Sequence, residues 1–547
     1  MGDAFLTELR AQDAILRRRG IALWIGAEPT FTDRRSQAPG WLFEPGGDEK
    51  PERAKALLAA LARRLGAAAQ VEPLAGRHYP GESEPRFCFG VRCGGALFTV
   101  MPDPAVVEVN MAPAPDLETF LAWSEALHAA AEDVSLSPVR YRFNGQATDS
   151  GGGGQLTLGG ASPEASPFFM HPQLLPRLVR YLCNNPSLSY AFAAECVGSA
   201  SQGPRPDEGA RERFEELQVA LDRLEARGAH VTPSELWASL APLLVDASGN
   251  SHRAELNVEK LWNPFLAGRG RLGVVELRSL RMQPAARREA AVAALFRAVA
   301  ARLATVPYDE PLADWGGALH DQFALPYFLA ENLRGVLGDL AASGLALGPA
   351  TSALLLDPPE SLAEVTLGAA TLAVSPALEF WPLVGDVASQ ERSGARLVDA
   401  STSRLQVAVA HPPGEGPGRL TAAGWDVPLH PVDGGRRHLA GLRWRAFAPQ
   451  PGLHPGLPAL DPVVLRWERD GQRVGLELHG WIPGGGAYEG LPDGADEAAR
   501  RRRERVRVVE PGRTAANAPP TSAGLTLDLR RLDALRGQAR AAAGGLR

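Results

Sequence analysis

The residues with the clearest chemical potential are three glutamates that lie within short apolar runs. Glu28 lies in LWIGAEPT, Glu108 in AVVEVN and Glu276 in GVVELR. Short apolar runs rich in β-branched residues are typical of buried strands. An unpaired carboxylate taken out of water costs several kcal/mol, so three such strands most economically share one polar site. Metal ions and an arginine would neutralise the charge of that site.

Neighbouring polar residues extend this candidate site. Side chains two residues apart share a face of a strand, so Asn110 faces with Glu108 and Arg278 faces with Glu276. Carboxylate oxygens suit Mg²⁺ or Mn²⁺, and a guanidinium beside them can hold a phosphate or a carboxylate bidentately. A structural ion pair is the simpler alternative for each acid, and a plain pair with Glu276 is the alternative for Arg278.

A glycine-rich segment, TDSGGGGQLTLGG, follows at residues 148–160. Glycine allows a backbone to approach a ligand closely, which is the functional interpretation of its four consecutive glycines. A flexible linker is the alternative, although the alternation after Gln155 is typical of a strand. The four glycines are Gly151, Gly152, Gly153 and Gly154.

Two further segments carry candidate residues. In SGNSHRAEL, an extended chain would place Arg253 and Glu255 on one face and Asn250 and His252 on the other. The alternative there is a satisfied loop histidine and a salt bridge. The HYPGE turn at residues 78–82 would either close over a substrate or form an ordinary surface turn.

Hydrophobic periodicity predicts which elements position these residues. The expected strands near the site lie at 86–92, 96–101 and 105–111. From Thr366 to about Val509 the chain reads as strands separated by Pro/Gly turns, which predicts a separate β-sandwich-like domain. The expected helices lie at 3–19, 51–66, 117–131, 172–184, 210–227, 233–244, 284–305 and 319–342.

Composition narrows the class of protein. The chain has 547 residues, of which 45% are hydrophobic and 22% are charged, as in a globular protein with a large core. The net charge of −6 gives no reason to expect nucleic-acid binding, and no apolar run approaches the roughly 20 residues that cross a bilayer. The four cysteines match no zinc motif, so we expect reduced thiols in a cytoplasmic protein. High Ala, Gly, Pro and Arg content indicates a GC-rich bacterial genome. Walker, HExxH and GxSxG motifs are absent from the sequence.

A long ordered set of motifs runs from about residue 21 to 490. In these motifs the chain resembles the amidoligase family that is often fused behind a bacterial transglutaminase-like domain. That family is similar to the glutamine synthetase and glutamate–cysteine ligase superfamily. The motifs are IGAEPTF, RHYPGE, DPAVVEVNMAP, FNGQATDSGGGGQLTLGGASP, NNPSLSYAFAAECVGSASQGPRPDE, LLVDASGNSHRAELNVEKLWNP, LGVVELRSLRMQP, ADWGGALHDQFALPYF, LEFWPLVG and LRWRAF.

The resemblance implies an α+β fold, with a glutamine synthetase-like curved antiparallel sheet, flanking helices and a C-terminal β-sandwich-like domain. We therefore expect an N-terminal helix at 1–20, an amidoligase domain at 21–345, a β-rich domain at 360–510, and a linker and helix at 511–547. The implied chemistry is ATP-dependent amide formation through an acyl phosphate, with Mg²⁺ or Mn²⁺ stabilising the transferring phosphoryl group.

Carried over residue by residue, the resemblance assigns three kinds of role. The expected metal ligands are Glu28, Glu108, Glu255 and Glu276. Arg253 and Arg278 resemble clamps for phosphate or carboxylate, and with Glu276 they are the expected catalytic residues. The expected nucleotide-binding residues are Gly151, Gly152, Gly153, Gly154, Gln155 and Arg278.

The chain departs from the family pattern at two positions and in length. Gln155 stands where relatives have a histidine, and it offers an oxygen rather than an imidazole nitrogen. Thr30 stands where glutamine synthetase-type enzymes have the second acid of Glu-x-Glu. The transglutaminase-like half and a long insertion carried by larger relatives are also missing. Such losses would fit reduced activity.

Three hypotheses about function follow. The first is a Mg²⁺/ATP-dependent carboxylate–amine ligase acting on an amino acid or a peptide, together with protein partners of a peptide-modifying pathway. The second is a non-catalytic binding or scaffold protein that keeps the fold and the cleft. The third is a metal-dependent amide hydrolase that works without ATP. The first predicts no nucleic-acid or membrane partner and is compatible with a homo-oligomer.

Overall fold

The computed structural model divides the chain into two compact units, each described here by itself. The first unit contains residues 1–140, 147–315 and 330–357, and the second contains 141–146, 316–329 and 358–547. The structure describes residues 3–33, 49–68, 70–74, 88–101, 106–150, 153–194, 196–266, 270–384, 398–448, 452–484, 486, 488–510 and 524–532.

A four-stranded antiparallel sheet of the first unit carries most of the candidate site. Its strand order is β1-β10-β13-β12, so strands far apart in the sequence become neighbours. This arrangement brings the Glu28 and Glu276 segments to the same sheet, with one strand between them. The strands are β1 (Trp24–Glu28), β10 (Gln155–Gly159), β13 (Val275–Leu277) and β12 (Leu256–Asn257).

A second antiparallel sheet continues directly from the first. Only Pro29 separates β1 from β2, and β6 pairs with β2 in the order β3-β4-β5-β6-β2-β7. The backbone N of Val109 donates to Pro29 O (2.9 Å) and that of Met111 donates to Ala27 O (3.0 Å). The β6 strand therefore runs on beside β1, and this links the two sheets. The strands are β2 (Thr30–Asp33), β3 (Glu72–Pro73), β4 (Phe89–Cys93), β5 (Ala96–Met101), β6 (Val107–Asn110) and β7 (Leu136–Ser137).

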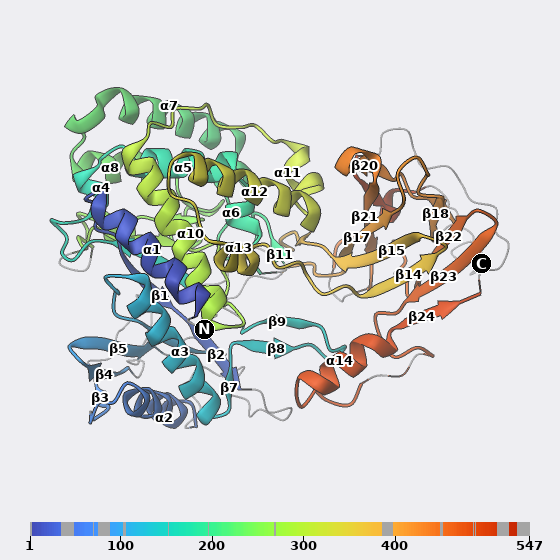
Figure 1. The fold of residues 1–547 in the computed structure, drawn as a ribbon, viewed down its shortest axis with the longest axis horizontal. Helices are drawn as coiled ribbons and strands as arrows, with labels where there is room; N and C mark the ends of the chain where they lie inside the picture. The colour runs from blue at the N-terminus through green and yellow to red at the C-terminus, as the bar shows by residue number, and fades with distance from the viewer. Residues whose placement is uncertain are drawn as a thin grey trace. The chain divides into compact units, whose positions relative to one another are not determined.

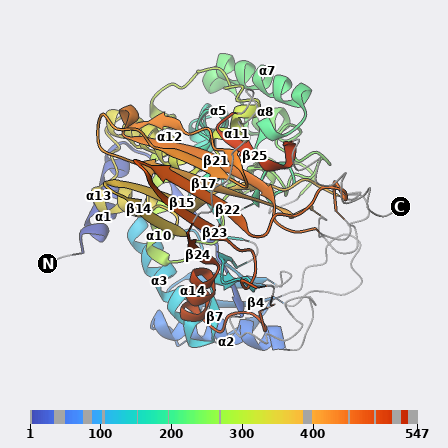
Figure 2. The ribbon, with the colours of Figure 1, turned by 90° about the vertical axis from the view of Figure 1, so that its right-hand side faces the viewer.

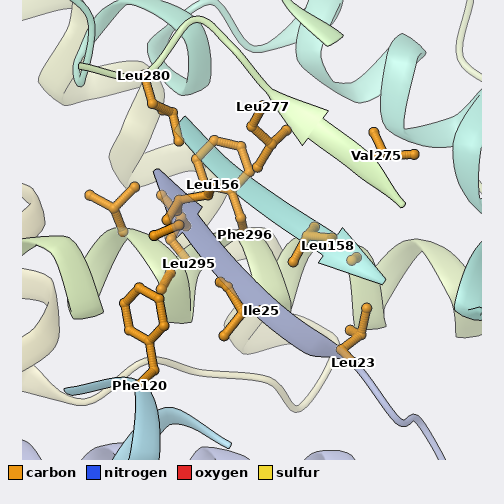
Figure 3. Packing of buried hydrophobic residues seen from close by; sticks show 14 of the residues in the cluster. Leu23, Ile25, Phe120, Leu156, Leu158, Val275, Leu277, Leu280, Leu295 and Phe296 are labelled. Atoms are coloured by element: carbon orange, nitrogen blue, oxygen red, sulfur yellow. The ribbon is translucent and has the colours of Figure 1, made fainter. Parts of the chain in front are cut away.

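One face of the β1-β10-β13-β12 sheet is apolar and packs on helix α10 (Ala286–Thr305). Figure 3 shows Ile25, Leu158 and Leu277 on this face, near Leu295 and Phe296 of the helix. Each fully buried side chain of this size contributes roughly 1.5–3 kcal/mol. Because strand side chains alternate, burial of this face commits the polar residues between them to the other face.

The remaining helices of the first unit surround these sheets, and α2 and α3 lie against the strands of the second sheet (Figures 1 and 2). The seven helices predicted before residue 306 are confirmed, although α8 ends four residues earlier than expected. The helices are α1 (Ala4–Arg18), α2 (Glu49–Arg64), α3 (Leu117–Asp133), α4 (Pro167–Met170), α5 (Leu174–Asn184), α6 (Ser187–Tyr190), α7 (Arg211–Arg227), α8 (Pro233–Leu240), α9 (Glu259–Trp262) and α13 (Pro349–Leu355). Three short strands complete this part of the chain: β8 (Val139–Tyr141), β9 (Ala147–Asp149) and β11 (Cys196–Val197).

The single helix predicted at 319–342 is wrong, since the structure has two helices there. Helix α11 (Gly317–Gln322) ends before helix α12 (Pro326–Ala342) begins. Pro326 lacks a backbone N–H, so it is tolerated in the first turn of a helix and cannot continue one from the preceding residues. The helical periodicity of the sequence continues across this break and conceals it.

The second unit is strand-rich, as predicted, and its two mostly antiparallel sheets share one hydrophobic core. Leu372, Val407 and Leu442 come from one sheet, while Leu465 and Trp467 come from the other. Figure 2 shows the long strands of this unit running alongside one another. The first sheet contains β14 (Ala363–Leu367), β15 (Ala370–Pro376), β17 (Thr402–Ala410), β21 (Arg437–Arg445), β20 (His430–Val432) and β25 (Thr526–Asp528). The second contains β19 (Trp425–Asp426), β18 (Arg419–Ala422), β22 (Val463–Arg469), β23 (Gln472–Leu478) and β24 (Val506–Val509). The remaining elements of this unit are β16 (Glu379–Phe380) and α14 (Ala495–Glu504).

The predicted α+β class is thus confirmed, while the specific likeness to glutamine synthetase and the exact domain boundaries stay predictions. The helix expected within 511–547 falls mostly on residues that the structure does not describe. Across the described ranges, the helices are too short or too polar to traverse a lipid bilayer.

Candidate functional site

The polar face of the β1-β10-β13-β12 sheet gathers the predicted acids. The strand register aligns Gly26 with Thr157, Thr157 with Glu276, and Glu276 with Asn257. Glu28 lies at the end of β1, two residues after Gly26, and its partner on β10 is Gln155. The two acids that were predicted from separate segments therefore lie on one polar surface.

A lysine links these two acids. The Nζ atom of Lys260, on helix α9, lies 3.1 Å from Glu28 Oε1 and 3.1 Å from Glu276 Oε2. Arg278 donates from Nη1 to Glu276 Oε1. The side chains of Glu276 and Glu28 are 3% and 12% exposed, whereas that of Lys260 is 40% exposed. The acids are thus largely withdrawn from water, while the ammonium group connecting them can reach it.

The electrostatics of this group follow from burial and from these contacts. Burial and the charge of Glu276 raise the pKa of Glu28, against the opposing effect of Lys260 and Arg278. Burial also acts to raise the pKa of Glu276, but Arg278 and Lys260 outweigh it and hold that pKa below its usual value. Burial acts to lower the pKa of Lys260, and the two carboxylates outweigh it, so the net shift is upward. Lys260 therefore stays a cation.

Two arginines add positive charge beside the acids. Burial and the nearby charge of Arg278 lower the pKa of Arg253, which means that the two guanidinium groups are close enough to repel each other. The Nε atom of Arg278 is buried and has no hydrogen-bond partner among the described residues. A buried donor without a partner costs about 1–3 kcal/mol, and a bound anion would satisfy it.

The glycine-rich segment packs tightly against this site. Gly154 N donates to Glu28 O (2.8 Å). A Cβ atom at Gly154 would lie 2.0 Å from Met282 N, and one at Gly153 would lie 2.1 Å from Thr30 Cγ2. Glycine is therefore required at both positions by the protein's own packing. Gly151 and Gly152 lie outside the described residues, so their predicted contact with a nucleotide stays a prediction.

The third predicted acid lies on the adjoining sheet. Glu108 is paired with Thr30 in the β2–β6 register, and its Oε1 accepts a hydrogen bond from Asn110 Nδ2 (3.1 Å). The hydrogen bonds that extend β6 along β1 keep the same register, which places Asn110 opposite Glu28. Glu108 is thus two residues further along the same strand pair, at the edge of the polar surface that holds Glu28.

Glu255 has different partners from the other acids. Ser189 donates its hydroxyl to Glu255 Oε1, and the Nη1 atom of Arg205 lies 3.8 Å from the same oxygen. The side chain of Glu255 is 2% exposed. Arg205 is fully buried and also donates to both carboxylate oxygens of Asp207 and to the carbonyl of Leu182. The role of Glu255 as a metal ligand stays a prediction, while its observed contacts are those of a buried structural cluster.

The protonation of Glu255 gives a testable prediction. Burial raises its pKa from 4.5 to about 7, although Arg205 and Ser189 act to lower it. Between these two pH values the folded state holds a proton that the unfolded state has lost. The contribution of the Glu255 carboxyl to the free energy of unfolding is therefore full below pH 4.5. It falls as the pH rises to about 7, by up to about 1.4 kcal/mol per pH unit.

Glu255→Gln should flatten this part of the stability profile, which urea denaturation at several pH values would measure. Glu225→Gln is a matched control, because Glu225 is a partly buried glutamate that pairs with Arg177 elsewhere in the same unit. It should leave the slope unchanged. Equal slopes for the wild type and Glu255→Gln would contradict the assignment.

The extended conformation expected for SGNSHRAEL is wrong. Residues 251–255 form a turn and bends, because Asn250 accepts the backbone N–H of His252 at its side chain and that of Arg253 at its carbonyl. His252 Nε2 lies 2.9 Å from Glu259 Oε2, so this residue is the satisfied loop histidine of the simpler alternative. The HYPGE turn at 78–82 lies outside the described residues.

Sequence reasoning missed Lys260, although a signal was present. The chain contains only three lysines among its 57 basic residues, at positions 50, 55 and 260. The chain otherwise uses arginine, so a lysine only three residues after Asn257, beside the candidate acids, was a signal of a specific role. Sequence reasoning also missed Ser189 and Arg205, which lie far from Glu255 along the chain and carry no such signal.

The donor set can be compared with the needs of a metal ion. No three His, Cys, Asp or Glu side chains form a group suited to a metal ion in the ranges that the structure covers. Mg²⁺, however, is usually held by one or two carboxylates, several waters and substrate phosphates. Glu28 and Glu276 fit that pattern, and the unsatisfied Arg278 Nε fits a phosphate beside it.

Comparison with known proteins identifies the class of protein. Residues 6–93 and 96–530 match the family described as "Putative amidoligase enzyme (DUF2126)". The chain belongs to this family, as its motifs predicted, and the match covers both structural units. The family description is that of an enzyme of the ligase class. No curated protein matches the chain.

Proposed function

We propose that the protein is an ATP-dependent carboxylate–amine ligase whose active site is the polar face around Glu28 and Glu276. The observation that carries this proposal is that two largely buried acids, Glu28 and Glu276, meet Lys260 and Arg278 on one polar surface. A guanidinium beside such acids can bind an oxyanion, and the nearby Arg253 adds a second positive charge. Membership of the amidoligase family supports the same class of reaction.

The proposed residues have distinct roles. Glu28 and Glu276 would hold Mg²⁺, with Glu108 as a further acid at the edge of the site. The metal would supply positive charge to the phosphates of ATP. Arg253 and Arg278 would bind the transferring phosphoryl group or the substrate carboxylate, and Gly153, Gly154 and the neighbouring Gln155 would border the nucleotide.

The proposed reaction has two steps. A substrate carboxylate oxygen attacks the γ-phosphorus of ATP, and the bond from that phosphorus to the bridging oxygen of the β-phosphate breaks. ADP is the leaving group, and the substrate becomes an acyl phosphate. The amine nitrogen then attacks the acyl carbon, the carbon–oxygen bond to phosphate breaks, and the nitrogen loses a proton. The chemistry needs positioning and charge stabilisation rather than a covalent nucleophile, and that need matches a site built of acids, arginines and glycines. We propose an amino acid or a peptide as substrate, in the cytoplasm.

Isothermal titration with ATP, with and without Mg²⁺, tests this proposal. Wild-type protein should bind ATP only when Mg²⁺ is present, and Glu276→Gln should weaken the binding because it removes one negative ligand. Glu225→Gln, the ion-paired control, should bind as the wild type does. Equal ATP affinity in the presence and absence of Mg²⁺ would contradict the metal-dependent site.

A non-catalytic binding protein is the second candidate, and a specific observation favours it. Thr30 is fully buried and its hydroxyl is 2.5 Å from the Ser150 hydroxyl, so this oxygen is committed to the fold rather than to a ligand. Gln155, the other departure from the family pattern, is 6% exposed. Under this alternative the protein binds a nucleotide or a peptide without turnover. Phosphate release in a screen of amino acids and peptides as paired substrates would exclude it.

A further inference from the structure

Lys260 occupies the place between Glu28 and Glu276 at which a shared cation is expected. Its Nζ atom lies 3.1 Å from one oxygen of each carboxylate. A divalent cation that both acids bind would have to take the same place, because like charges exclude each other at such distances. An ammonium group and a metal ion therefore cannot both bridge this pair of acids.

The environment of Lys260 allows it to leave. Its side chain is 40% exposed, whereas those of Glu28 and Glu276 are 12% and 3% exposed. A lysine carries its charge on a flexible four-carbon stem with three rotatable donors, so the ammonium can move into water without a change in the backbone. The acids, held on strands β1 and β13, cannot follow it.

The negative charge of Glu28 and Glu276 favours a cation at the position of Lys260. Glu28 and Glu276 carry two negative charges if both are ionised, and Arg278 forms its ion pair with Glu276. Without a second cation, a buried pair of like charges would remain, and that is strongly unfavourable. Lys260 supplies this second cation when no metal is bound.

We propose that Lys260 is an exchangeable counter-ion that bridges the two acids in the metal-free protein and is displaced into solvent by a divalent cation. This inference rests on the proposed function, since it requires that Glu28 and Glu276 bind a metal. It adds that metal affinity is set by competition with a residue of the chain itself. A cation thereby lies between the two acids in both states.

Lysine reactivity tests the exchange without a mutation in the site. The protein is treated briefly with acetic anhydride, with and without Mg²⁺ and in the absence of ATP, and peptides are quantified by mass spectrometry. Acetylation of Lys260 should increase several-fold with Mg²⁺, since ion-paired ammonium groups react poorly. Lys55 is the internal reference, because its only described ion pair is with Glu52 on the surface, and its acetylation should not change. Unchanged reactivity of Lys260 at saturating Mg²⁺ would overturn the proposal.

Metal affinity tests the competition itself. Mn²⁺ binding, followed by electron paramagnetic resonance, should be on the order of tenfold tighter in Lys260→Met than in the wild type, as expected when competing ion pairs of ordinary strength are lost. Lys55→Met should bind as the wild type does. In the absence of metal, Lys260→Met should melt at a lower temperature, and Mn²⁺ should restore it.

The outcomes separate the two proposals. Wild-type binding of Mn²⁺ together with equal or weaker binding in Lys260→Met would overturn the exchange and leave the ligase site intact. No Mn²⁺ binding in either protein would overturn the metal site on which both proposals depend. If Lys260→Met does not fold without metal, the acetylation experiment on wild-type protein decides the question alone.

Discussion

Substitution of Arg278 by leucine is expected to weaken the binding of Mg²⁺–ATP about 10- to 100-fold, since a hydrogen-bonded contact with a charged group contributes about 1.5–3 kcal/mol. Arg278 pairs with Glu276 through Nη1 and keeps a buried, unsatisfied donor at Nε. Leucine removes the proposed phosphate contact of this side chain, and that loss weakens binding of the nucleotide complex. Isothermal titration of wild-type and variant protein measures the effect.

Two further variants sharpen this test. Arg278→Lys keeps the charge but not the planar fork of donors, so it should bind with intermediate affinity. Arg177→Leu is the matched control, because Arg177 is an arginine of similar exposure that pairs with Glu225 outside the site. Nucleotide affinity should not change in this control. A similar loss in Arg177→Leu and Arg278→Leu would mean that reduced stability, rather than a lost phosphate contact, explains the result.

Substitution of Arg205 by alanine is expected to lower the free energy of unfolding of the first unit by about 3–5 kcal/mol, as is typical when one partner of a buried ion pair is removed. Arg205 is fully buried and satisfies Asp207, Ser189 and two backbone carbonyls, at Leu182 and Cys183. Alanine would leave those acceptors without their donor and would leave the buried acids without a counter-ion. Denaturant unfolding monitored by hydrogen exchange within 182–208 would measure the loss locally.

A surface arginine and a double variant provide the controls. Arg211→Ala should lower the free energy of unfolding far less than Arg205→Ala does, because Arg211 is 61% exposed and its pairs with Glu215 and Asp314 lie in solvent. The double variant Arg205→Met/Glu255→Gln should be more stable than Arg205→Met alone, since it no longer contains a buried acid without its counter-ion. An Arg205→Ala protein as stable as Arg211→Ala would show that the buried cluster does not hold this region together.

The second unit shows how much of a fold local sequence patterns can predict. The alternation in RLQVAVAH, VVLRWER and VGLELHGWI predicts strands, and the structure confirms them as β17, β22 and β23. The run TLGAATLAVS also forms strands, but Gly368 adopts a positive φ of 58° and divides it into the β14–β15 hairpin. Strand periodicity depends only on neighbouring residues, so the sequence alone predicts these strands. The turn inside the run depends on one glycine, Gly368, and the periodicity does not reveal it.

In the candidate site, too, local relations were predictable from the sequence and distant ones were not. The sequence by itself determined that Glu28, Glu108 and Glu276 lie on strands and that Arg278 can reach Glu276, because these relations depend on neighbours one or two residues apart. It also carried the family motifs from which membership was predicted. Two-residue alternation needs no knowledge of the rest of the chain.

Only the tertiary structure decided which acids meet and what neutralises them. The strand order β1-β10-β13-β12 brings Glu28 within reach of Lys260, 232 residues further along the chain. The fold also places Glu255 beside Ser189 and Arg205, which lie 66 and 50 residues before it in the sequence. Register between distant strands depends on the packing of the apolar face and on loop lengths, and neither is encoded near the acids themselves. Charge neutralisation inside a protein is therefore a property of the assembled fold.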